Sequence, residues 1–294
     1  MNQPLVSVLI PNYNHEDTIM ETLQSVLNQT YKNMQIIIID DGSTDESWNL
    51  INQFKDSRIE AYRLEKNQRI CKATNYGITK IKGDYVARMD SDDIWYPEKI
   101  ERQLEYMTSH KGCKVCFTWC DFIDENGNNI NDIEINRVRL HEVKFSSQED
   151  AVERFYFRGN CLVHSSVVME KEVMQTIGEY DIGYNQLQDL DYWRRIVQKY
   201  SIDVITEKYM AVRRFLNEEK QQTNVSNMSE STEIRVFNEY MEIRAHYFEN
   251  MSDELFVKAF NKYFIREGLL TSEQLECEKA FLMCKPQDGW DGIP

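Results

Sequence analysis

The chain has 294 residues, of which 41% are hydrophobic and 12% aromatic, so it can bury a sizeable core and is not expected to be disordered. Its formal net charge of -15 disfavours general binding of nucleic acid, because such binding needs a basic surface. No stretch approaches the roughly 18 apolar residues of a transmembrane helix. The start of the chain lacks the cationic region of a signal peptide. The odd number of cysteines favours reduced thiols. Together these features predict a cytoplasmic protein.

The first part of the chain alternates short apolar runs with segments of helical periodicity. Four runs are predicted to be strands: Leu5 to Ile10, Met34 to Ile39, Ile59 to Leu64, and Tyr85 to Met89. Met34 to Ile39 is continuously hydrophobic, as strands covered on both faces are. Each of the four runs is followed by apolar residues at helical spacing: Ile19 to Leu27, Trp48 to Phe54, Arg69 to Ile81, and Ile100 to Met107. The alternation predicts an α/β fold with a mostly parallel central sheet flanked by helices.

Two turns contain residues that often cap helices. Asn14 follows the first strand and is predicted to cap the helix that begins near Ile19. Ser43 and Glu46 have the spacing of a capping box, which predicts that they open the next helix.

Carboxylates gather at the ends of two of the predicted strands. Asp40 and Asp41 end the second strand, and Asp90, Asp92 and Asp93 follow the fourth. Because open α/β folds bind ligands at the carboxyl ends of parallel strands, Asp41 and Asp92 are expected at one rim. Crowded carboxylates repel unless a cation neutralises them, and oxygen donors suit Mg²⁺ or Mn²⁺. The alternative is a solvated acidic turn that binds no ion.

The second half is less regular. It contains predicted strands from Val115 to Ile123, from Gly159 to Met169 with His164 at its middle, and from Val204 to Phe215, and a helix that starts at Gln188. Asp189 lies in the first turn of that helix, where the helix dipole stabilises a carboxylate whether or not it is catalytic. No structure is predicted between Asn131 and Gln148, nor from Asp288 to Pro294.

From Glu233 to about Cys284 the chain is charged and helix-periodic, which predicts a C-terminal helical appendage. We therefore predict two parts, a catalytic domain over residues 1–217 and a helical extension over residues 218–294. The apolar residues of the extension are expected to pack on the catalytic domain or on a partner protein.

Five motifs in order resemble an inverting family 2 glycosyltransferase of the nucleotide-diphospho-sugar transferase, or GT-A, fold. The resemblance covers about residues 4 to 215, and it rests on Val6 to Asn14, Asp40 to Asp45, Gly83 to Asp93, Asn160 to Met169, and Asp189 with Trp193 and Arg194. It implies a single nucleotide-binding domain in which the nucleotide lies over the first half of the sheet.

The resemblance also implies roles for individual residues of the donor site. Pro11, Tyr13 and Asp41 would hold the base, with Asn14 beside them. Asp90 would lie near the ribose. Asp92, with Asp90, would bind the Mn²⁺ or Mg²⁺ that bridges the diphosphate of a nucleotide-sugar donor, most simply a UDP-sugar.

Asp189 matches the family's catalytic base, which removes the proton from an acceptor hydroxyl as its oxygen attacks the anomeric carbon. A single displacement inverts the anomeric configuration, and the metal stabilises charge on the leaving group. The implied acceptor is a glycan or lipid-linked glycan, as in polysaccharide or cell-surface glycan synthesis. Contact with the inner face of a membrane and homo-oligomerisation stay open.

Two positions depart from the family pattern. Arg69 stands where the family often has a glycine, and it either reaches the diphosphate or marks a different loop. The family often has a histidine after the last strand, whereas Arg213 to Asn217 contains none. The sequence therefore leaves open whether this protein has a third metal ligand or a lid over the donor.

Two other functions are compatible with parts of the sequence. A sugar-phosphate nucleotidyltransferase would share the sheet, but it should have a glycine-rich phosphate loop where this chain has Pro11 to Asn14. A catalytically silent nucleotide- or glycan-binding protein is the other alternative, and the presence of both Asp92 and Asp189 disfavours it.

Overall fold

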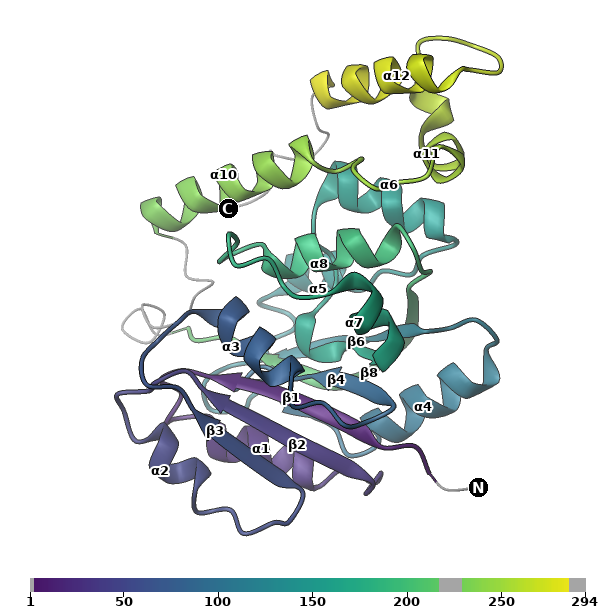
Figure 1. Ribbon diagram of the computed structural model, residues 1–294. Coiled ribbons are helices and arrows are strands. Elements are labelled where there is room, and N and C mark those ends of the chain that lie inside the picture. The colour runs from purple at the N-terminus through teal and green to yellow at the C-terminus, as the bar shows by residue number, and fades with distance from the viewer. Residues whose placement is uncertain (1–2, 217–228, 286–294) are drawn as a thin grey trace.

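A computed structural model describes residues 3–216 and 229–285. These ranges form an eight-stranded sheet in the order β3-β2-β1-β4-β7-β6-β8-β5 (Figure 1). The strands are β1 (Val6–Asn12), β2 (Met34–Asp40), β3 (Ile59–Arg63), β4 (Tyr85–Arg88), β5 (Ile94–Trp95), β6 (Val115–Ile123), β7 (Val168–Glu170) and β8 (Asp203–Arg213).

The sheet is parallel in its first half and mixed in its second. β3, β2, β1 and β4 run parallel, and β7 pairs antiparallel with both β4 and β6. β8 is parallel to β6 and antiparallel to β5. The fold class predicted from the βα alternation is confirmed. The parallel half aligns the ends of β1, β2 and β4, because Asn12 is opposite Asp40, and Leu9 opposite Arg88.

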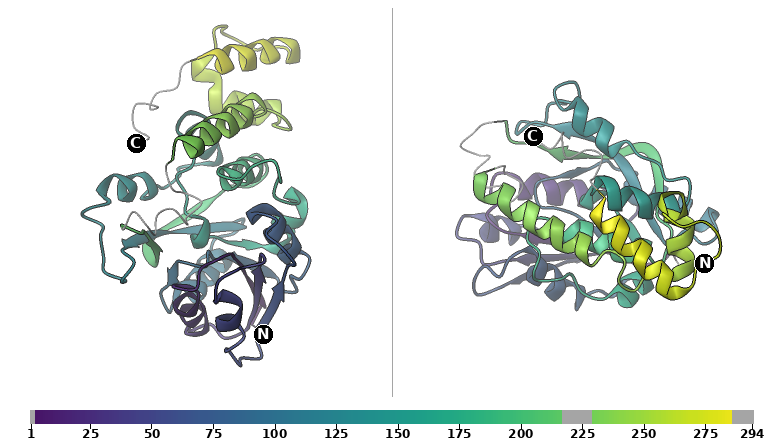
Figure 2. Two further views of the ribbon diagram at one scale, coloured as in Figure 1. Left: turned by 90° about the vertical axis from the view of Figure 1, so that its left-hand side faces the viewer. Right: turned by 90° about the horizontal axis from the view of Figure 1, so that it is seen from above.

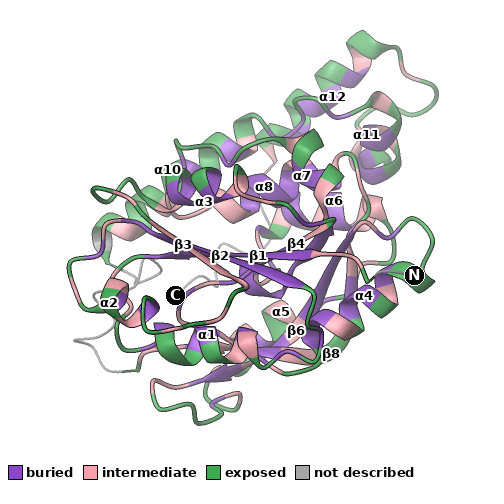
Figure 3. Cartoon of the chain, turned by 60° about the horizontal axis from the view of Figure 1, so that its bottom comes forward, coloured by how far each residue is buried: buried purple, intermediate pink, exposed green. Residues whose placement is uncertain are grey.

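Helices cover both faces of the sheet (Figures 1 and 2). Buried side chains from α1 (Ile19–Leu27), α2 (Ser47–Ile51), α4 (Lys99–Ser109) and α5 (Ile135–His141) join one core cluster. Those from α3 (Ile70–Ile78), α6 (Gln148–Arg158), α7 (Lys171–Ile177) and α8 (Gln188–Val197) join the clusters on the opposite face. The central strands β1 and β2 are fully buried, which explains their apolar sequences, whereas the edge strand β3 is only partly buried (Figure 3).

The C-terminal helices pack on the catalytic part. They are α10 (Glu230–Ala245), α11 (Asp253–Phe260), the short 3₁₀ helix η2 (Asn261–Tyr263) and α12 (Ser272–Cys284). The ring of Tyr156 on α6 lies 4.9 Å from that of Phe248 and 5.4 Å from that of Phe260. Tyr247 donates its hydroxyl to the carbonyl of Val152. The extension therefore shares a continuous hydrophobic core with α6 and α8. The predicted boundary between residues 217 and 218, and the terminal segment from Asp288, lie outside the described residues.

The predicted helix cap at Asn14 is wrong. α1 begins after Thr18, whose side chain makes no capping hydrogen bond. Asn14 has a positive φ of 55°, and its Oδ1 accepts a hydrogen bond from the backbone N–H of Thr44 at 2.8 Å. It therefore joins two turns at the carboxyl end of the sheet.

The capping box predicted at Ser43 and Glu46 is also wrong. Glu46 itself precedes α2, without a side-chain cap. The hydroxyl of Ser43 binds the carboxylate of Asp40. The hydroxyl of Ser43 therefore donates to Asp40 at the end of β2 and does not cap α2.

The strand predicted from Gly159 to Met169 is mostly absent. The structure has an irregular segment, then the 3₁₀ helix η1 (His164–Ser166), and only the three residues of β7. The segment is buried although it is not a strand, because it lies under the end of β4. No helix in either described range is long and apolar enough to cross a membrane.

Candidate active site

The carboxyl ends of β1 and β2 are fixed by a buried polar network. Asn12 donates its side-chain N–H to Asp40 at 2.9 Å, and the hydroxyl of Ser43 donates to the same carboxylate oxygen at 2.5 Å. Arg63 approaches the other oxygen of Asp40 at 3.3 Å. Asp40 is fully buried and fully engaged, so it shapes the rim and is not available to a ligand.

Asp41, the next residue, is held by backbone groups. Its Oδ1 accepts the backbone N–H of Gln68 at 2.8 Å, and the backbone N–H of Arg69 also donates to its carboxylate. Gly42 brings the loop close, because a Cβ there would lie 2.7 Å from the backbone of Lys66. Burial raises the pKa of Asp41 to about 6 despite the backbone hydrogen bonds that lower it. Its carboxylate can accept an N–H from a bound base at neutral pH.

The other residues predicted to hold the base lie beside Asp41. Pro11 is buried within β1 opposite Ile39, and Tyr13 is 39% exposed just beyond the strand. The backbone N–H of Asn14 donates to Ser43 at 3.0 Å. Tyr13 can stack on a ligand, whereas Pro11 and Asn14 set the shape of the turn.

The acidic turn after β4 contains three carboxylates with different surroundings. Asp90 pairs with the buried guanidinium of Arg88 at 2.8 Å. Burial raises the pKa of Asp90, but the charge of Arg88 and the hydrogen bond from Ser165, with further contributions, together outweigh burial, and the net shift of the pKa is downward. Asp93 accepts the backbone N–H of Arg213 at 3.1 Å, so it fastens this turn to β8. Asp92 is the one of the three whose side chain makes no hydrogen bond or ion pair with another residue of the described ranges; only its own backbone N–H donates to it.

The donor set suits a divalent cation that is shared with a diphosphate. No group of three or more His, Cys, Asp or Glu side chains within the described ranges could hold a metal alone. Mg²⁺ sites commonly use one or two carboxylates and complete their coordination with substrate phosphates. Asp92, whose pKa is raised by burial and by the charge of Asp90, offers such a carboxylate. The residues therefore fit the implied ion.

Asp189 projects from the first turn of α8 toward this rim. Asn160 donates its side-chain N–H to Oδ2 at 2.6 Å, and the backbone N–H of Leu190 donates to Oδ1 at 2.7 Å. Burial, with a contribution from the charge of Asp90, raises its pKa to about 7, against the hydrogen bonds that lower it. A carboxyl group that is oriented by Asn160 and titrates near neutrality is suited to general base catalysis.

The irregular segment that contains η1 packs under the acidic turn after β4. The backbone N–H of Asp90 donates to the hydroxyl of Ser165 at 2.9 Å, and the indole of Trp95 donates to the carbonyl of Ser165. His164 is buried 3.0 Å from the hydroxyl of Tyr180, and burial lowers its pKa to about 3. His164 is therefore neutral and structural.

Arg213, at the end of β8, binds the backbone of two loops. Its Nε donates to the carbonyl of Asp92 at 3.0 Å, and its Nη1 donates to the carbonyl of Asp124 at 3.2 Å. Its side chain is buried. The arginine thus fixes the backbone of the acidic turn, a role that no local pattern indicates.

The extension contributes a residue that the sequence prediction missed. Glu239 on α10 is buried and accepts three backbone N–H groups, from Asn185 at 2.9 Å and from Gln186 and Leu187 at 2.8 Å. This loop leads directly into α8 and Asp189. Glu239 therefore positions the segment that presents the candidate base.

We expect Glu239→Gln to lower turnover while leaving UDP affinity unchanged. The amide can accept through one oxygen only, so at least one buried N–H loses its partner, which costs about 1–3 kcal/mol of stability. The loop is then held less firmly, and Asp189 loses its fixed position. Turnover should fall about tenfold or more, because small misplacements of reacting groups are costly. Steady-state kinetics and UDP titration measure the two effects. Glu254→Gln, at an exposed position of the same extension, is the matched control; a lower melting temperature with normal turnover would contradict the positioning role.

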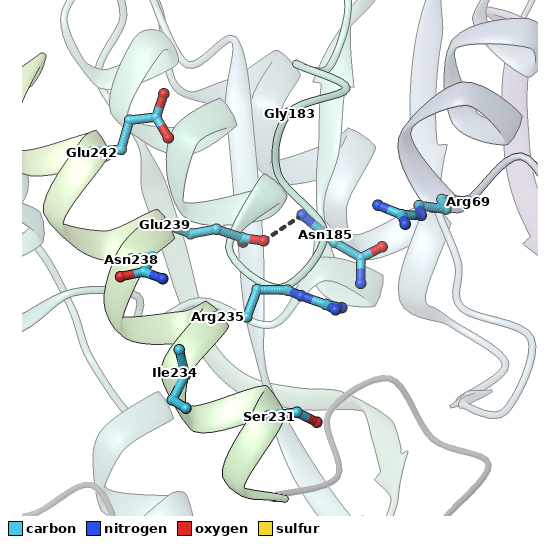
Figure 4. A pocket seen from close by; sticks show the side chains of 9 residues that line it. All are labelled: Arg69, Gly183, Asn185, Ser231, Ile234, Arg235, Asn238, Glu239 and Glu242. Atoms are coloured by element: carbon cyan, nitrogen blue, oxygen red, sulfur yellow. Dashed lines mark hydrogen bonds between the residues drawn. The ribbon is translucent and has the colours of Figure 1, made fainter.

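The structure brings most of the predicted site residues to one rim. Asp41, Asp90 and Asp92 follow parallel strands that flank β1, and the charge of Asp90 acts on Asp189. Arg69 starts α3 with a φ of 73°, so the arginine keeps a backbone conformation that glycine adopts without strain. Its side chain lines a cavity beside α10 (Figure 4).

The known proteins that this chain resembles in sequence are glycosyltransferases. Residues 7–170 match the family model described as Glycosyl transferase family 2. An uncharacterized glycosyltransferase of Methanocaldococcus jannaschii is 31% identical over 70% of each chain. The Escherichia coli UDP-Glc:alpha-D-GlcNAc-diphosphoundecaprenol beta-1,3-glucosyltransferase WfaP is 34% identical over 66% of this chain and 71% of its own. The putative teichuronic acid biosynthesis glycosyltransferase TuaG of Bacillus subtilis is 32% identical over 67% and 73%.

Two solved structures share the fold. Staphylococcus aureus TarS 1–349 in complex with UDP-GlcNAc aligns with a TM-score of 0.64 at 18% identity, over 88% of this chain and 72% of that one. The mannosyltransferase PcManGT of Pyrobaculum calidifontis, in complex with GDP-Man and Mn²⁺, aligns with a TM-score of 0.56 at 15% identity, over 96% and 70%.

Proposed function

Because this chain belongs to glycosyltransferase family 2, we propose that it transfers a sugar from a UDP-sugar to a hydroxyl group of a glycan, with inversion and with a divalent cation. The observation that carries this proposal is the environment of Asp189. It is a carboxyl group with a pKa near 7, at the start of a helix that faces the acidic rim.

The residues of the rim would bind the donor by complementary chemistry. The carboxylate of Asp41 would accept the N–H of uracil, and Tyr13 would stack on the base. Asp90, held by Arg88, would lie near the ribose, and Arg69 would stand at the edge of the donor site. Asp92 would hold Mn²⁺ or Mg²⁺, which when bound would act as a Lewis acid toward the diphosphate leaving group.

Asp189 would then move the proton. Its carboxylate takes the hydrogen of the acceptor hydroxyl while that oxygen forms its bond to the anomeric carbon and the bond to the diphosphate breaks. Asn160 keeps the carboxylate in place. No enzyme nucleophile takes part, so one displacement inverts the anomeric configuration.

The relatives support a role in building surface polysaccharide. The WfaP protein acts on a sugar attached to diphosphoundecaprenol, and TuaG is described for teichuronic acid biosynthesis. We accordingly propose a glycan, or a glycan linked to a lipid diphosphate, as the acceptor of this protein.

The anomeric configuration of the product tests this mechanism. UDP-sugars with α-linked donors, screened with glycan acceptors and Mn²⁺, should give β-linked products that proton NMR identifies by the coupling of the anomeric hydrogen. An α-linked product would contradict a single displacement with Asp189 as base.

A further inference from the structure

A cavity of about 360 Å³ lies between the extension and the catalytic part. Figure 4 shows it bounded by α10, by the loop that leads to Asp189, and by Arg69 at the start of α3. It is lined by Arg69, Gly183, Asn185, Ser231, Ile234, Arg235, Asn238, Glu239 and Glu242. Its volume falls within the range of small-molecule sites.

Two guanidinium groups converge in this cavity. The side chains of Arg69 and Arg235 come from opposite walls and point toward Asn185 (Figure 4). Neither side chain makes a hydrogen bond or an ion pair with any residue of the described ranges. Both arginines are exposed, so water solvates them in the free protein, and two guanidinium groups that face each other are suited to bind one phosphate between them.

The carboxylates of the cavity do not neutralise this pair. Glu239 is committed to three backbone N–H groups. Glu242 lies at the far end of the cavity, with its carboxylate directed away from both guanidinium groups (Figure 4). Asn185 and Asn238 add neutral polar groups, which suit the oxygens of a phosphate or of a sugar.

The position of the cavity favours the acceptor over the donor. Arg235 belongs to α10, outside the sheet whose strand ends form the donor rim. Gly183 and Asn185 belong to the loop that leads into α8 and Asp189, although Asp189 itself does not line the cavity. The backbone of Gln68 is bound to Asp41 on the donor side, and the side chain of the next residue, Arg69, lies in the cavity.

Building on the proposed function, we propose that this cavity binds a phosphate group of the acceptor, with Arg69 and Arg235 as its ligands. The acceptor is then an anionic glycan, such as a sugar attached through a diphosphate, and the extension is part of the acceptor site. Arg69, with its strained backbone, holds a guanidinium where a glycine would have none.

Calorimetric titration of the full chain tests this proposal. The protein is titrated with UDP in the presence of Mg²⁺. Ethyl diphosphate or the neutral ethyl β-glucoside is then titrated into the UDP-saturated protein and, separately, into the protein without UDP. Ethyl diphosphate should bind and the glucoside should bind much more weakly. Arg235→Gln should weaken ethyl diphosphate binding at least about tenfold and leave UDP affinity unchanged. Arg266→Gln, at an exposed position of the extension outside the cavity, is the matched control.

Each contrary result has a distinct meaning. No binding of ethyl diphosphate, equal binding of the glucoside, or an unchanged affinity in Arg235→Gln would overturn the anionic acceptor site. Loss of ethyl diphosphate binding once UDP is present would assign the phosphate to the donor and would also overturn it. Failure of the first titration, with UDP, would instead contradict the proposed function.

Discussion

Replacing Asp189 with asparagine is expected to reduce sugar transfer by about 10²–10⁴-fold, the usual contribution of a general base. The amide has nearly the shape of the carboxylate, but it cannot take the proton of the acceptor hydroxyl. Since Asp189 is proposed to contact the acceptor hydroxyl and neither the base nor the metal, UDP affinity should change little. Turnover assays and calorimetric titration of UDP measure the two quantities.

The pH dependence gives a second measure of the same residue. The pKa of Asp189 is about 7, and the base must be deprotonated, so turnover should rise as the pH increases through about 7 and level off above it. The pKa lies above the ordinary value of a carboxyl group, so ionisation of Asp189 disfavours the folded state at high pH. Asp189→Asn should therefore melt at the same temperature as the unmodified protein or higher at pH 8. A normal turnover in Asp189→Asn would contradict the assignment; Asp132→Asn, at an exposed aspartate, is the control.

Removing the extension by ending the chain at residue 216 is expected to yield an aggregated or unstable protein. The buried aromatic residues Tyr247, Phe248, Phe256 and Phe260 complete the core over α6. Each buried side chain of this size contributes about 1.5–3 kcal/mol, and the total stability of a domain is about 5–15 kcal/mol. The loss therefore exceeds what the remaining domain can tolerate.

Single substitutions in the extension test whether its buried rings, and not its exposed ones, stabilise the protein. Phe260→Ala, at a fully buried ring, should lower the free energy of unfolding by about 3–5 kcal/mol, whereas Phe281→Ala, at a ring that is 48% exposed, should change it by about 0.5 kcal/mol or less. Thermal and denaturant unfolding measure both. A truncated chain that stays monodisperse and as heat-stable as the full protein would contradict the shared core.

Local patterns were sufficient to predict the strands and the acidic motifs. The apolar runs of β1, β2 and β4 end at carboxylates, and neighbouring parallel strands bring those ends together. The same reasoning failed after Gly159, because a buried irregular segment is as apolar as a strand. Ser165, which binds the backbone of Asp90, has no local signal.

The residues that the sequence did not reveal act over long separations. Glu239 binds a loop more than 50 residues earlier, at separations of 52 to 54 residues, and Arg213 reaches the carbonyl of Asp92 across 121 residues. A glutamate on a charged helix and an arginine at a strand end are common on solvated surfaces. Only the tertiary fold shows that these two are buried and that their partners are backbone groups.

Calorimetric titration of the full protein with UDP, with and without Mn²⁺, tests the central claim most directly. We expect UDP to bind tightly only with the metal, and Asp92→Ala to lose most of this metal dependence. GDP should bind more weakly if Asp41 reads uracil. Absence of UDP binding under all conditions, or binding that Mn²⁺ and Asp92→Ala both leave unchanged, would contradict a metal-dependent donor site at this rim.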